Sequence, residues 1–327
     1  MTIERVVAVS FNEHEDANNL LPVRQSAYRA HHSTETAVIA VHNDIARNAD
    51  CTGQVSVLVL LDLSAAFDTV DHKILLDILG YRFGITGLML KWYRSYFADR
   101  TQTFQVGLDR SIAFIIDCSV PQGSVLDSLK FVAYTENLAS VIEKHELDHH
   151  LYADDTQIAD HLQLTQDAAA ITNIERCVKS VHAWCTFKWL HLNPTKSAKI
   201  WFRSRTSLHR LHGVDLSLHI GENIIEPLSV VRDLGVFLES ELAMTSHITK
   251  ISSVCYYQLR RLKQMRRVLG ETITARLVST FIISRLDYCN AILAGLPQST
   301  MAPFQRVQNS AVRMVKRLGS YNYITEA

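Results

Sequence analysis

The stretch that decides the fold is HHLYADDTQIAD, residues 149–160, in which two short apolar segments flank a pair of adjacent carboxylates. Residues 150–153 and 156–159 predict the two strands of a tight hairpin, with Asp154 and Asp155 forming its turn. Upstream, Val55–Leu61 is a continuous apolar run that suits a buried central strand, and it ends directly on Asp62. A carboxylate at the end of such a strand is costly unless something compensates its charge.

The three carboxylates have two explanations that the residues alone leave open. In the first, Asp62 caps a following helix, and Asp154 and Asp155 are turn residues with local hydrogen bonds. In the second, the end of Val55–Leu61 lies beside the hairpin, and the three side chains supply hard oxygen ligands for two Mg²⁺ ions. Two such ions can activate a 3′-hydroxyl and stabilise a departing pyrophosphate. Zinc is disfavoured, because the histidines at 31/32 and 149/150 are adjacent rather than spaced for joint ligation.

The remaining pattern predicts mixed strands and helices up to about residue 240 and helices alone beyond it. Helical periodicity marks residues 34–47, 73–80, 85–98, 124–145 and 166–186, whereas 101–108 and 111–118 predict a hairpin. Further strands are expected at 198–202, 216–220 and 230–238, and helices at 245–269, 271–293 and 299–318. Residues 1–20 are expected to be a poorly ordered lead-in.

The composition indicates a folded chain that works in a reducing compartment. Hydrophobic residues make up 47% and charged residues 20%, which suits a buried core and argues against wholesale disorder. The six cysteines include no C-x-x-C pair, so free thiols are expected rather than disulfides or a zinc site. No apolar run reaches the length of a membrane span, so no membrane partner is expected.

The formal net charge of zero hides a basic C-terminal third. Residues 241–327 hold twelve Lys or Arg and four Asp or Glu, so about +8, which favours a phosphate-backbone partner. Five basic side chains in this part are interleaved with tyrosine and leucine on one expected helix: Arg260, Arg261, Lys263, Arg266 and Arg267. They predict either a nucleic-acid-binding face or the solvated side of an amphipathic helix.

Seven segments, in order, resemble the motifs of non-LTR retrotransposon (LINE-type) reverse transcriptases, over roughly residues 21–320. They are SAYRAHHSTETA (Ser26–Ala37), LVLLDLSAAFDTVDH (Leu58–His72), SVPQGSVL (Ser119–Leu126), YADDTQ (Tyr152–Gln157), LHLNPTKS (Leu190–Ser197), DLGVFLES (Asp233–Ser240) and SRLDYCNAILAGLP (Ser284–Pro297). The resemblance implies an α+β fold. Residues 21–240 would form partial fingers and the palm, an antiparallel sheet packed with helices, and residues 241–327 a thumb-like helical region. It also implies RNA-directed DNA polymerase activity, with two Mg²⁺ as cofactor and an RNA template, a DNA primer and dNTPs as partners.

The resemblance assigns roles to individual residues. The catalytic, metal-binding carboxylates would be Asp62, Asp154 and Asp155. Phe67 would be either a steric gate that excludes a ribose 2′-hydroxyl or a core aromatic. Gln122 and Gly123 would line the incoming nucleotide, the glycine by letting backbone come close. Lys196 would lie near the triphosphate, where a cation offsets developing charge, or else on the surface.

Two departures from the family pattern motivate a second hypothesis. After VPQGSVL, Asp127 and Lys130 place charge where the family packs an apolar helix against the palm, and a buried unpaired charge is costly. The family's earliest fingers motifs have no recognisable counterpart in residues 1–20, and no endonuclease or cysteine-rich segment flanks the resemblance. The alternative is therefore a catalytically inactive, truncated remnant that retains the fold, with or without nucleic-acid binding.

Overall fold

The computed structural model of the 327-residue chain describes residues 2–49, 54–64, 66–120, 123–163, 167–202, 217–221 and 223–319. The chain divides into two compact units. The first comprises residues 1–33, 53–199 and 213–227, and the second comprises 34–52, 200–212 and 228–327. This division does not coincide with the boundary expected near residue 240, because residues 34–52 and 228–240 group with the helical part of the chain.

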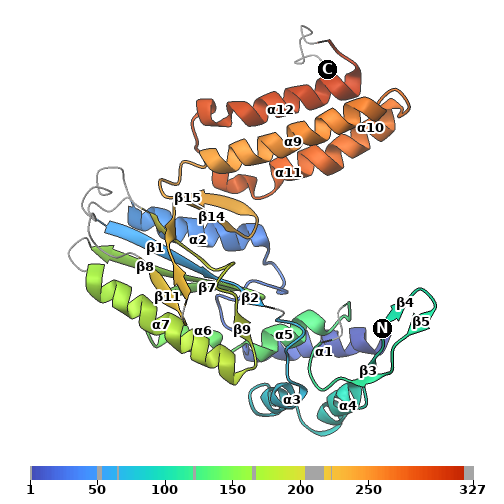
Figure 1. Ribbon diagram of the computed structural model, residues 1–327, viewed down its shortest axis with the longest axis vertical. Helices are drawn as coiled ribbons and strands as arrows, with labels where there is room; N and C mark the ends of the chain where they lie inside the picture. Colours follow the sequence, from blue (N-terminus) through green and yellow to red (C-terminus); the bar gives the residue numbers. More distant parts are fainter. Residues whose placement is uncertain are drawn as a thin grey trace. The chain divides into compact units, whose positions relative to one another are not determined.

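The first unit is built around three antiparallel strands with β1 (Gln54–Leu61) next to β8 (Asp155–Gln163) and β8 next to β7 (Asp148–Tyr152), as Figure 1 shows. They belong to a sheet of order β13-β10-β1-β8-β7, with β10 at Ala198–Phe202 and β13 at Pro227–Leu228. Three successive residues of β1 are fully buried: Val57, Leu58 and Val59. The strand is therefore covered on both faces, which explains why all but Ser56 of residues 55–61 are apolar, and the predicted buried strand is confirmed.

The hairpin at residues 148–163 differs from the prediction by one residue. Tyr152 pairs with Asp155, so the turn consists of Ala153 and Asp154, and Asp155 is the first residue of β8. Ala153 has a φ of 55°, in the left-handed region that favours glycine. Tight hairpin turns favour positive φ because it matches the twist of the flanking strands, which accounts for this strained alanine. Asp154 therefore lies at the tip of the hairpin, whereas Asp155 lies within strand β8.

Helices and short strands surround these three strands in the first unit. α6 (Leu138–Glu143) packs on α7 (Asp167–Phe187), which contacts β8 and β11 (Leu218–Ile220). α3 (His72–Tyr81) contacts α4 (Gly87–Phe97) and α5 (Asp127–Tyr134). The short strand pairs are β2 (Leu63–Ser64) with β9 (His191–Leu192), β3 (Thr101–Gln102) with β6 (Phe114–Ile115), β4 (Gln105–Val106) with β5 (Asp109–Arg110), and β11 with β12 (Asn223–Ile225).

Two predicted elements of this unit are interrupted. The helix expected over 124–145 is two helices, α5 and α6, separated at residues 135–137. The Thr135 hydroxyl donates to the Phe131 carbonyl, which offers the backbone a local alternative to continued helix. The hairpin expected over 101–118 contains two separate two-residue ladders, β3–β6 and β4–β5, instead of two long strands.

The N-terminal segment forms a helix where a poorly ordered lead-in was expected. α1 spans Thr2–Asn18. Val7, Phe11 and Glu15 recur at four-residue spacing and are buried, so one face of α1 packs against the unit. The Phe11 and Phe83 rings lie 5.4 Å apart between centroids, which joins α1 to the segment after α3.

The second unit contains α2 (Thr34–Ala49), a short hairpin and the predicted run of helices. The helical segments are α9 (Thr245–Met265), α10 (Glu271–Val278), a π-helical turn (Ser279–Ile283), α11 (Ser284–Asp287), a 3-10 turn (Asn290–Leu293) and α12 (Gln298–Lys316). α9 packs along α12 and contacts β15. The prediction that helices alone follow residue 241 is confirmed for the described part of this region. No helix in the described ranges is both long and apolar enough to cross a membrane.

The strand expected at 230–238 is a hairpin of β14 (Val230–Asp233) and β15 (Val236–Glu239). Its two turn residues, Leu234 and Gly235, have φ of 43° and 88°. The Tyr288 hydroxyl donates to the Leu234 carbonyl at 2.6 Å, and a Cβ built on Gly235 would lie 3.2 Å from the Tyr288 ring. Glycine is therefore required at this turn both by its conformation and by the close approach of a ring.

Candidate active site

The strand pairing brings the three predicted carboxylates to one end of the sheet. Leu61 of β1 pairs with Thr156 of β8, so Asp62, the next residue of the chain, follows at the end where the β7–β8 turn lies. Asp154 occupies that turn and Asp155 begins β8. The Lys196 ammonium lies 3.4 Å from Asp62 Oδ2, so four of the predicted site residues gather here.

The electrostatics of this group favour a cation. Burial, and then the charges of Asp154 and Asp62, raise the pKa of Asp155 from 3.8 to about 6, while Lys196 opposes the shift. Burial also raises the pKa of Asp154, and Asp62 adds to this effect. Asp62 Oδ2 is buried and accepts no hydrogen bond from the described residues, but it forms an ion pair with Lys196 at 3.4 Å. Crowded carboxylates that already attract one cation suit a hard divalent cation.

The carboxylates do not yet form a closed ligand set. Within the ranges that the structure describes, no group of three or more His, Cys, Asp or Glu is gathered closely enough to hold a metal ion. The carboxylate oxygens are hard ligands and fit a divalent cation in chemistry. Asp62, Asp154 and Asp155 are the residues that would hold it.

Asp155→Asn is expected to stabilise the metal-free protein at neutral pH. Between pH 3.8 and about 6 the folded state retains a proton that the unfolded state has lost, so stability falls as the pH rises through this window. The variant should gain about 2 kcal/mol in the free energy of unfolding at pH 7 and about nothing at pH 3.5. Denaturant titrations in a metal chelator at both pH values measure this, and an equal difference at the two values would contradict it.

A short loop holds Lys196 beside Asp62. The Asn193 side-chain oxygen accepts from the backbone N–H of Thr195 at 3.1 Å, forming a local turn. The Asn193 N–H donates to the Asp62 carbonyl at 2.8 Å, and the Ser197 hydroxyl donates to the Asn193 carbonyl at 2.8 Å. The loop is therefore fastened to the backbone of Asp62 itself.

A glutamine that the sequence analysis did not single out holds the turn. The Gln25 side-chain oxygen accepts from the N–H of Ala27 at 2.9 Å and from that of Ala153 at 3.3 Å. Ser26 N–H donates to the Leu151 carbonyl at 2.9 Å, so the segment lies along β7. Gln25 is buried, but its sequence neighbours are Arg24 and Ser26, so no local signal in the sequence marks it.

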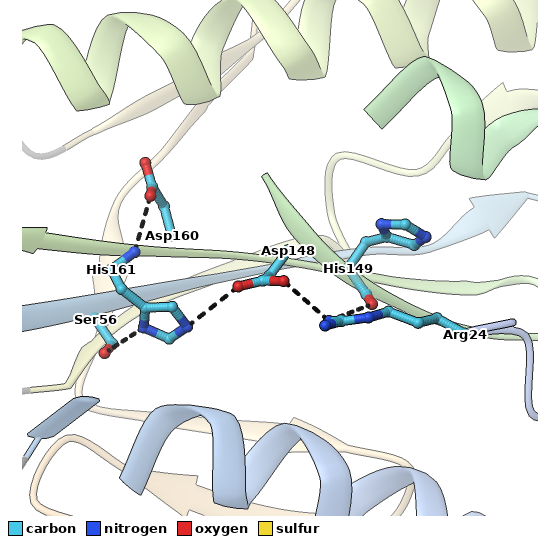
Figure 2. A network of polar contacts seen from close by, with 6 residues as sticks. All are labelled: Arg24, Ser56, Asp148, His149, Asp160 and His161. Atoms are coloured by element: carbon cyan, nitrogen blue, oxygen red, sulfur yellow. Dashed lines mark hydrogen bonds and ion pairs between the residues drawn. The ribbon is translucent and has the colours of Figure 1, made fainter. Parts of the chain in front are cut away.

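A second polar network fastens the same segment to the sheet (Figure 2). His161 Nδ1 lies 2.8 Å from the Ser56 hydroxyl, and its Nε2 lies 3.7 Å from Asp148, which forms an ion pair with Arg24 at 3.1 Å. The set resembles a Ser-His-Asp arrangement, but Ser56 is only 1% exposed and offers no accessible nucleophile. Its role is structural: it joins β1, β8 and β7 to the segment that contains Gln25.

The predicted nucleotide-binding residues lie around the start of α5. Gly123 has a φ of 81°, and its N–H donates to Asp127 Oδ2 at 2.9 Å. The Phe67 ring stacks on Phe131 with centroids 4.5 Å apart, and its backbone carbonyl accepts from Val120. Gln122 lies outside the described residues.

Tyr28 connects this region to the carboxylates and was also missed. Its side chain is half exposed, and its backbone has a φ of 59°. Burial raises the pKa of Tyr28, and the charges of Asp154 and Asp127 add to the shift, so the tyrosine is near both.

Lys130, one of the two departures from the family pattern, is 2% exposed. Its ammonium lies 3.8 Å from the centre of the Tyr96 ring, and it has no hydrogen-bond partner among the described residues. Burial and then the charge of Arg100 lower the pKa of Lys130 to about 7, against the opposing pull of Glu4 and Asp127. Asp127, the other departure, is satisfied by Gly123 and by the N–H of Ser128.

Lys130→Met is expected to raise stability at neutral pH. Between pH 7 and about 10 the unfolded state binds a proton that the folded state lacks, so wild-type stability rises with pH over this window. The variant should gain about 2 kcal/mol at pH 7, with the gain shrinking towards pH 10. Thermal and denaturant unfolding across this range measure it. Lys91→Met, at an exposed position of α4, is the matched control, and an equal gain there would contradict the argument.

The five predicted nucleic-acid-binding residues lie in the second unit. Arg260, Arg261 and Lys263 belong to α9, and Arg266 and Arg267 directly follow it. They do not all share one surface: the Arg261 guanidinium lies 5.7 Å from the Tyr257 ring, whereas Arg260, Lys263 and Arg266 line a cavity.

Comparison with known proteins identifies the family of this chain. The reverse transcriptase (RNA-dependent DNA polymerase) family matches residues 2–216, well over half of the chain. The protein therefore belongs to the reverse transcriptase family. Members of this family generally use divalent metal ions and act on nucleic acids. The predicted family and α+β fold class are thus confirmed.

Two of the curated relatives are retrotransposon proteins of Drosophila melanogaster. A probable RNA-directed DNA polymerase from transposon BS is 27% identical over 281 residues, covering 84% of this chain and 30% of the relative. The RNA-directed DNA polymerase from mobile element jockey is 26% identical over 270 residues, covering 80% of this chain and 28% of the relative. The chain thus spans less than a third of the length of these relatives.

Solved telomerase structures are also similar in fold. A Candida albicans telomerase in complex with a fragment of telomeric RNA has a TM-score of 0.46 and 10% identity, covering 97% of this chain and 51% of that chain. An apo Candida tropicalis telomerase truncated from its C-terminal domain has a TM-score of 0.48 and 12% identity, covering 73% and 43%.

Proposed function

We propose that this chain is the RNA-directed DNA polymerase domain of a non-LTR retrotransposon, transferring nucleotides from dNTPs to the 3′-hydroxyl of a DNA primer on an RNA template. The observation that carries the proposal is the meeting of Asp62, Asp154 and Asp155 at one end of the sheet, where burial and then the charges of the other two carboxylates raise the pKa of Asp155. The names of the Drosophila relatives support the same activity.

In this proposal the carboxylates act as ionised ligands. Two Mg²⁺ ions, held by Asp62, Asp154 and Asp155, would activate the 3′-hydroxyl and offset charge on the departing pyrophosphate. The primer oxygen forms a bond to the α-phosphorus, the bond from that phosphorus to the β-phosphate's bridging oxygen breaks, and the hydroxyl proton passes to solvent. Lys196 is 65% exposed beside Asp62, so its ammonium is free to turn towards a triphosphate.

Three further residues would select and orient the nucleotide. Phe67, held by stacking on Phe131, would place its ring where a ribose 2′-hydroxyl would lie. Gln122 would hydrogen-bond the nucleotide, and Gly123, whose φ of 81° suits glycine, would let backbone approach it. In the second unit, Arg260, Arg261, Lys263, Arg266 and Arg267 would hold the template-primer backbone.

Burial of Lys130 favours a second candidate, a catalytically inactive remnant that keeps the fold. Extension of a DNA primer on an RNA template, with dNTPs and with Mg²⁺ or a chelator, tests the proposal. Mg²⁺-dependent extension by the wild-type chain supports a polymerase. Salt-dependent RNA binding without any extension would contradict it in favour of the remnant.

A further inference from the structure

A cavity of about 360 Å³ lies between α9 and α12, wholly within the second unit. The basic residues of α9 and of the two positions after it divide around the cavity: Arg260, Lys263 and Arg266 recur at three-residue spacing and line it, whereas Arg261 and Arg267 do not. The opposite wall comes from α12, which contributes Arg313 and Ser310. The sequence pattern thus identified only one wall, because the other lies about fifty residues further along the chain.

The arginines of this cavity carry donors that nothing satisfies. The Nε and Nη2 atoms of Arg266 and the Nε of Arg313 are buried and have no hydrogen-bond partner among the described residues. Buried guanidinium N–H groups without an acceptor are costly, and they are rare in folded proteins. Arg266, directly after α9, and Arg313 of α12 therefore line one open cavity, and each has hydrogen-bonding capacity that the described residues do not use.

The charge of the cavity specifies an anion. Its described lining contains four cationic side chains and no Asp or Glu. A guanidinium fork matches the oxygens of phosphate, which can accept from two arginines at once. Ser310 adds a hydroxyl donor to the same wall.

Size and surroundings distinguish a strand from a small free ion. The cavity is larger than a phosphate group needs, and Tyr256, Leu259 and Met314 give it aromatic and apolar surface against which a sugar or base can pack. Arg261 and Arg267 are exposed outside the cavity and extend the positive charge beyond it. A ligand that continues past the cavity would meet this charge.

We propose that the cavity between α9 and α12 binds a backbone phosphate of a nucleic-acid strand, with Arg266 and Arg313 as the principal donors. The inference rests on the nucleic-acid partner of the proposed function, and it adds Arg313 and Ser310, which no motif marked. It does not depend on nucleotidyl transfer.

Binding of a fluorescent single-stranded RNA to the full chain, in a metal chelator and without dNTPs, tests this proposal. Arg313→Gln should weaken binding by about fivefold and lower the slope of log affinity against log salt by about 0.7, the value for one phosphate contact on a single strand. Arg306→Gln is the matched control, because it removes the same charge from an exposed position on the same helix without touching the cavity. It should change both quantities by less than half as much.

Three outcomes would overturn the proposal. Equal weakening by the two variants would mean that only diffuse charge matters. If Arg313→Gln weakens RNA binding but also lowers the melting temperature, Arg266→Gln decides between the two causes. Normal RNA binding by an Arg266→Gln variant that melts like wild type would trace the loss to misfolding. Inorganic phosphate at millimolar concentration provides the third outcome. If it raises the melting temperature of wild type but not of Arg313→Gln, and does not compete with RNA, the cavity binds a free ion. None of these measurements requires catalysis. If the chain fails to extend a primer but still binds RNA through the cavity, the proposed function fails and this inference holds.

Discussion

Asp154→Asn is expected to lower the rate of primer extension at least about a hundredfold while leaving the protein folded. The amide matches the carboxylate in size but lacks the charge that a divalent cation needs from the turn of β7–β8. It also removes one of the like charges that raise the pKa of Asp155, so the variant should unfold no more easily than wild type. Initial rates of dNTP incorporation on an RNA template, with melting temperatures, measure both effects.

Asp160→Asn provides the control for this experiment. Asp160 lies on the same strand, β8, and its pKa is also raised by burial, but its carboxylate accepts from the N–H of His161, away from the turn. The exchange makes the same chemical change and should alter incorporation less than twofold or so. Equal incorporation by wild type and both variants would contradict the proposed role of the three carboxylates.

Leu58→Ala is expected to destabilise the first unit by about 3 kcal/mol or more. Leu58 is fully buried at the middle of β1, the strand paired with β8 over its whole length. Loss of three carbon atoms there removes buried apolar surface and leaves a cavity that a central strand cannot easily collapse. Denaturant titration, with the slope checked for unchanged cooperativity, measures the change in the free energy of unfolding.

Leu88→Ala makes the identical change at a position of α4 where the side chain is 84% exposed. Its effect should stay within about 0.5 kcal/mol, because no core contact is lost. A similar loss at both positions would show that Leu58 does not contribute more than an exposed leucine.

Local sequence was sufficient to predict the elements that hold the carboxylates. Val55–Leu61 forms β1 because its six apolar residues, interrupted only by Ser56, have few other ways to be buried, and the hairpin follows from two apolar segments around a polar pair. Its register was wrong by one residue, because a pairing of Tyr152 with Asp155 and a left-handed Ala153 depend on the strands' twist and neighbours. The family came from the order of motifs rather than from any single motif.

The missed features depend on contacts between distant parts of the chain. α1 is a helix whose buried face packs near Phe83, and nothing within residues 1–20 reveals that partner. Gln25 has no distinguishing local pattern, since its acceptor role is defined by the turn at Ala153. Lys130 was marked as a departure from the family pattern, but its position over the Tyr96 ring required the fold.

The hydrogen bond between Gln25 and Ala153 joins residues 128 positions apart. The closure of so long a loop is entropically costly, and contacts of high sequence separation tend to form late in folding. During synthesis, the segment around Gln25 would leave the ribosome long before its partner turn exists. β7 cannot align with that segment, and the carboxylates cannot meet, until about half of the chain has been made. The site therefore depends on contacts of long sequence separation, which tend to form late in folding.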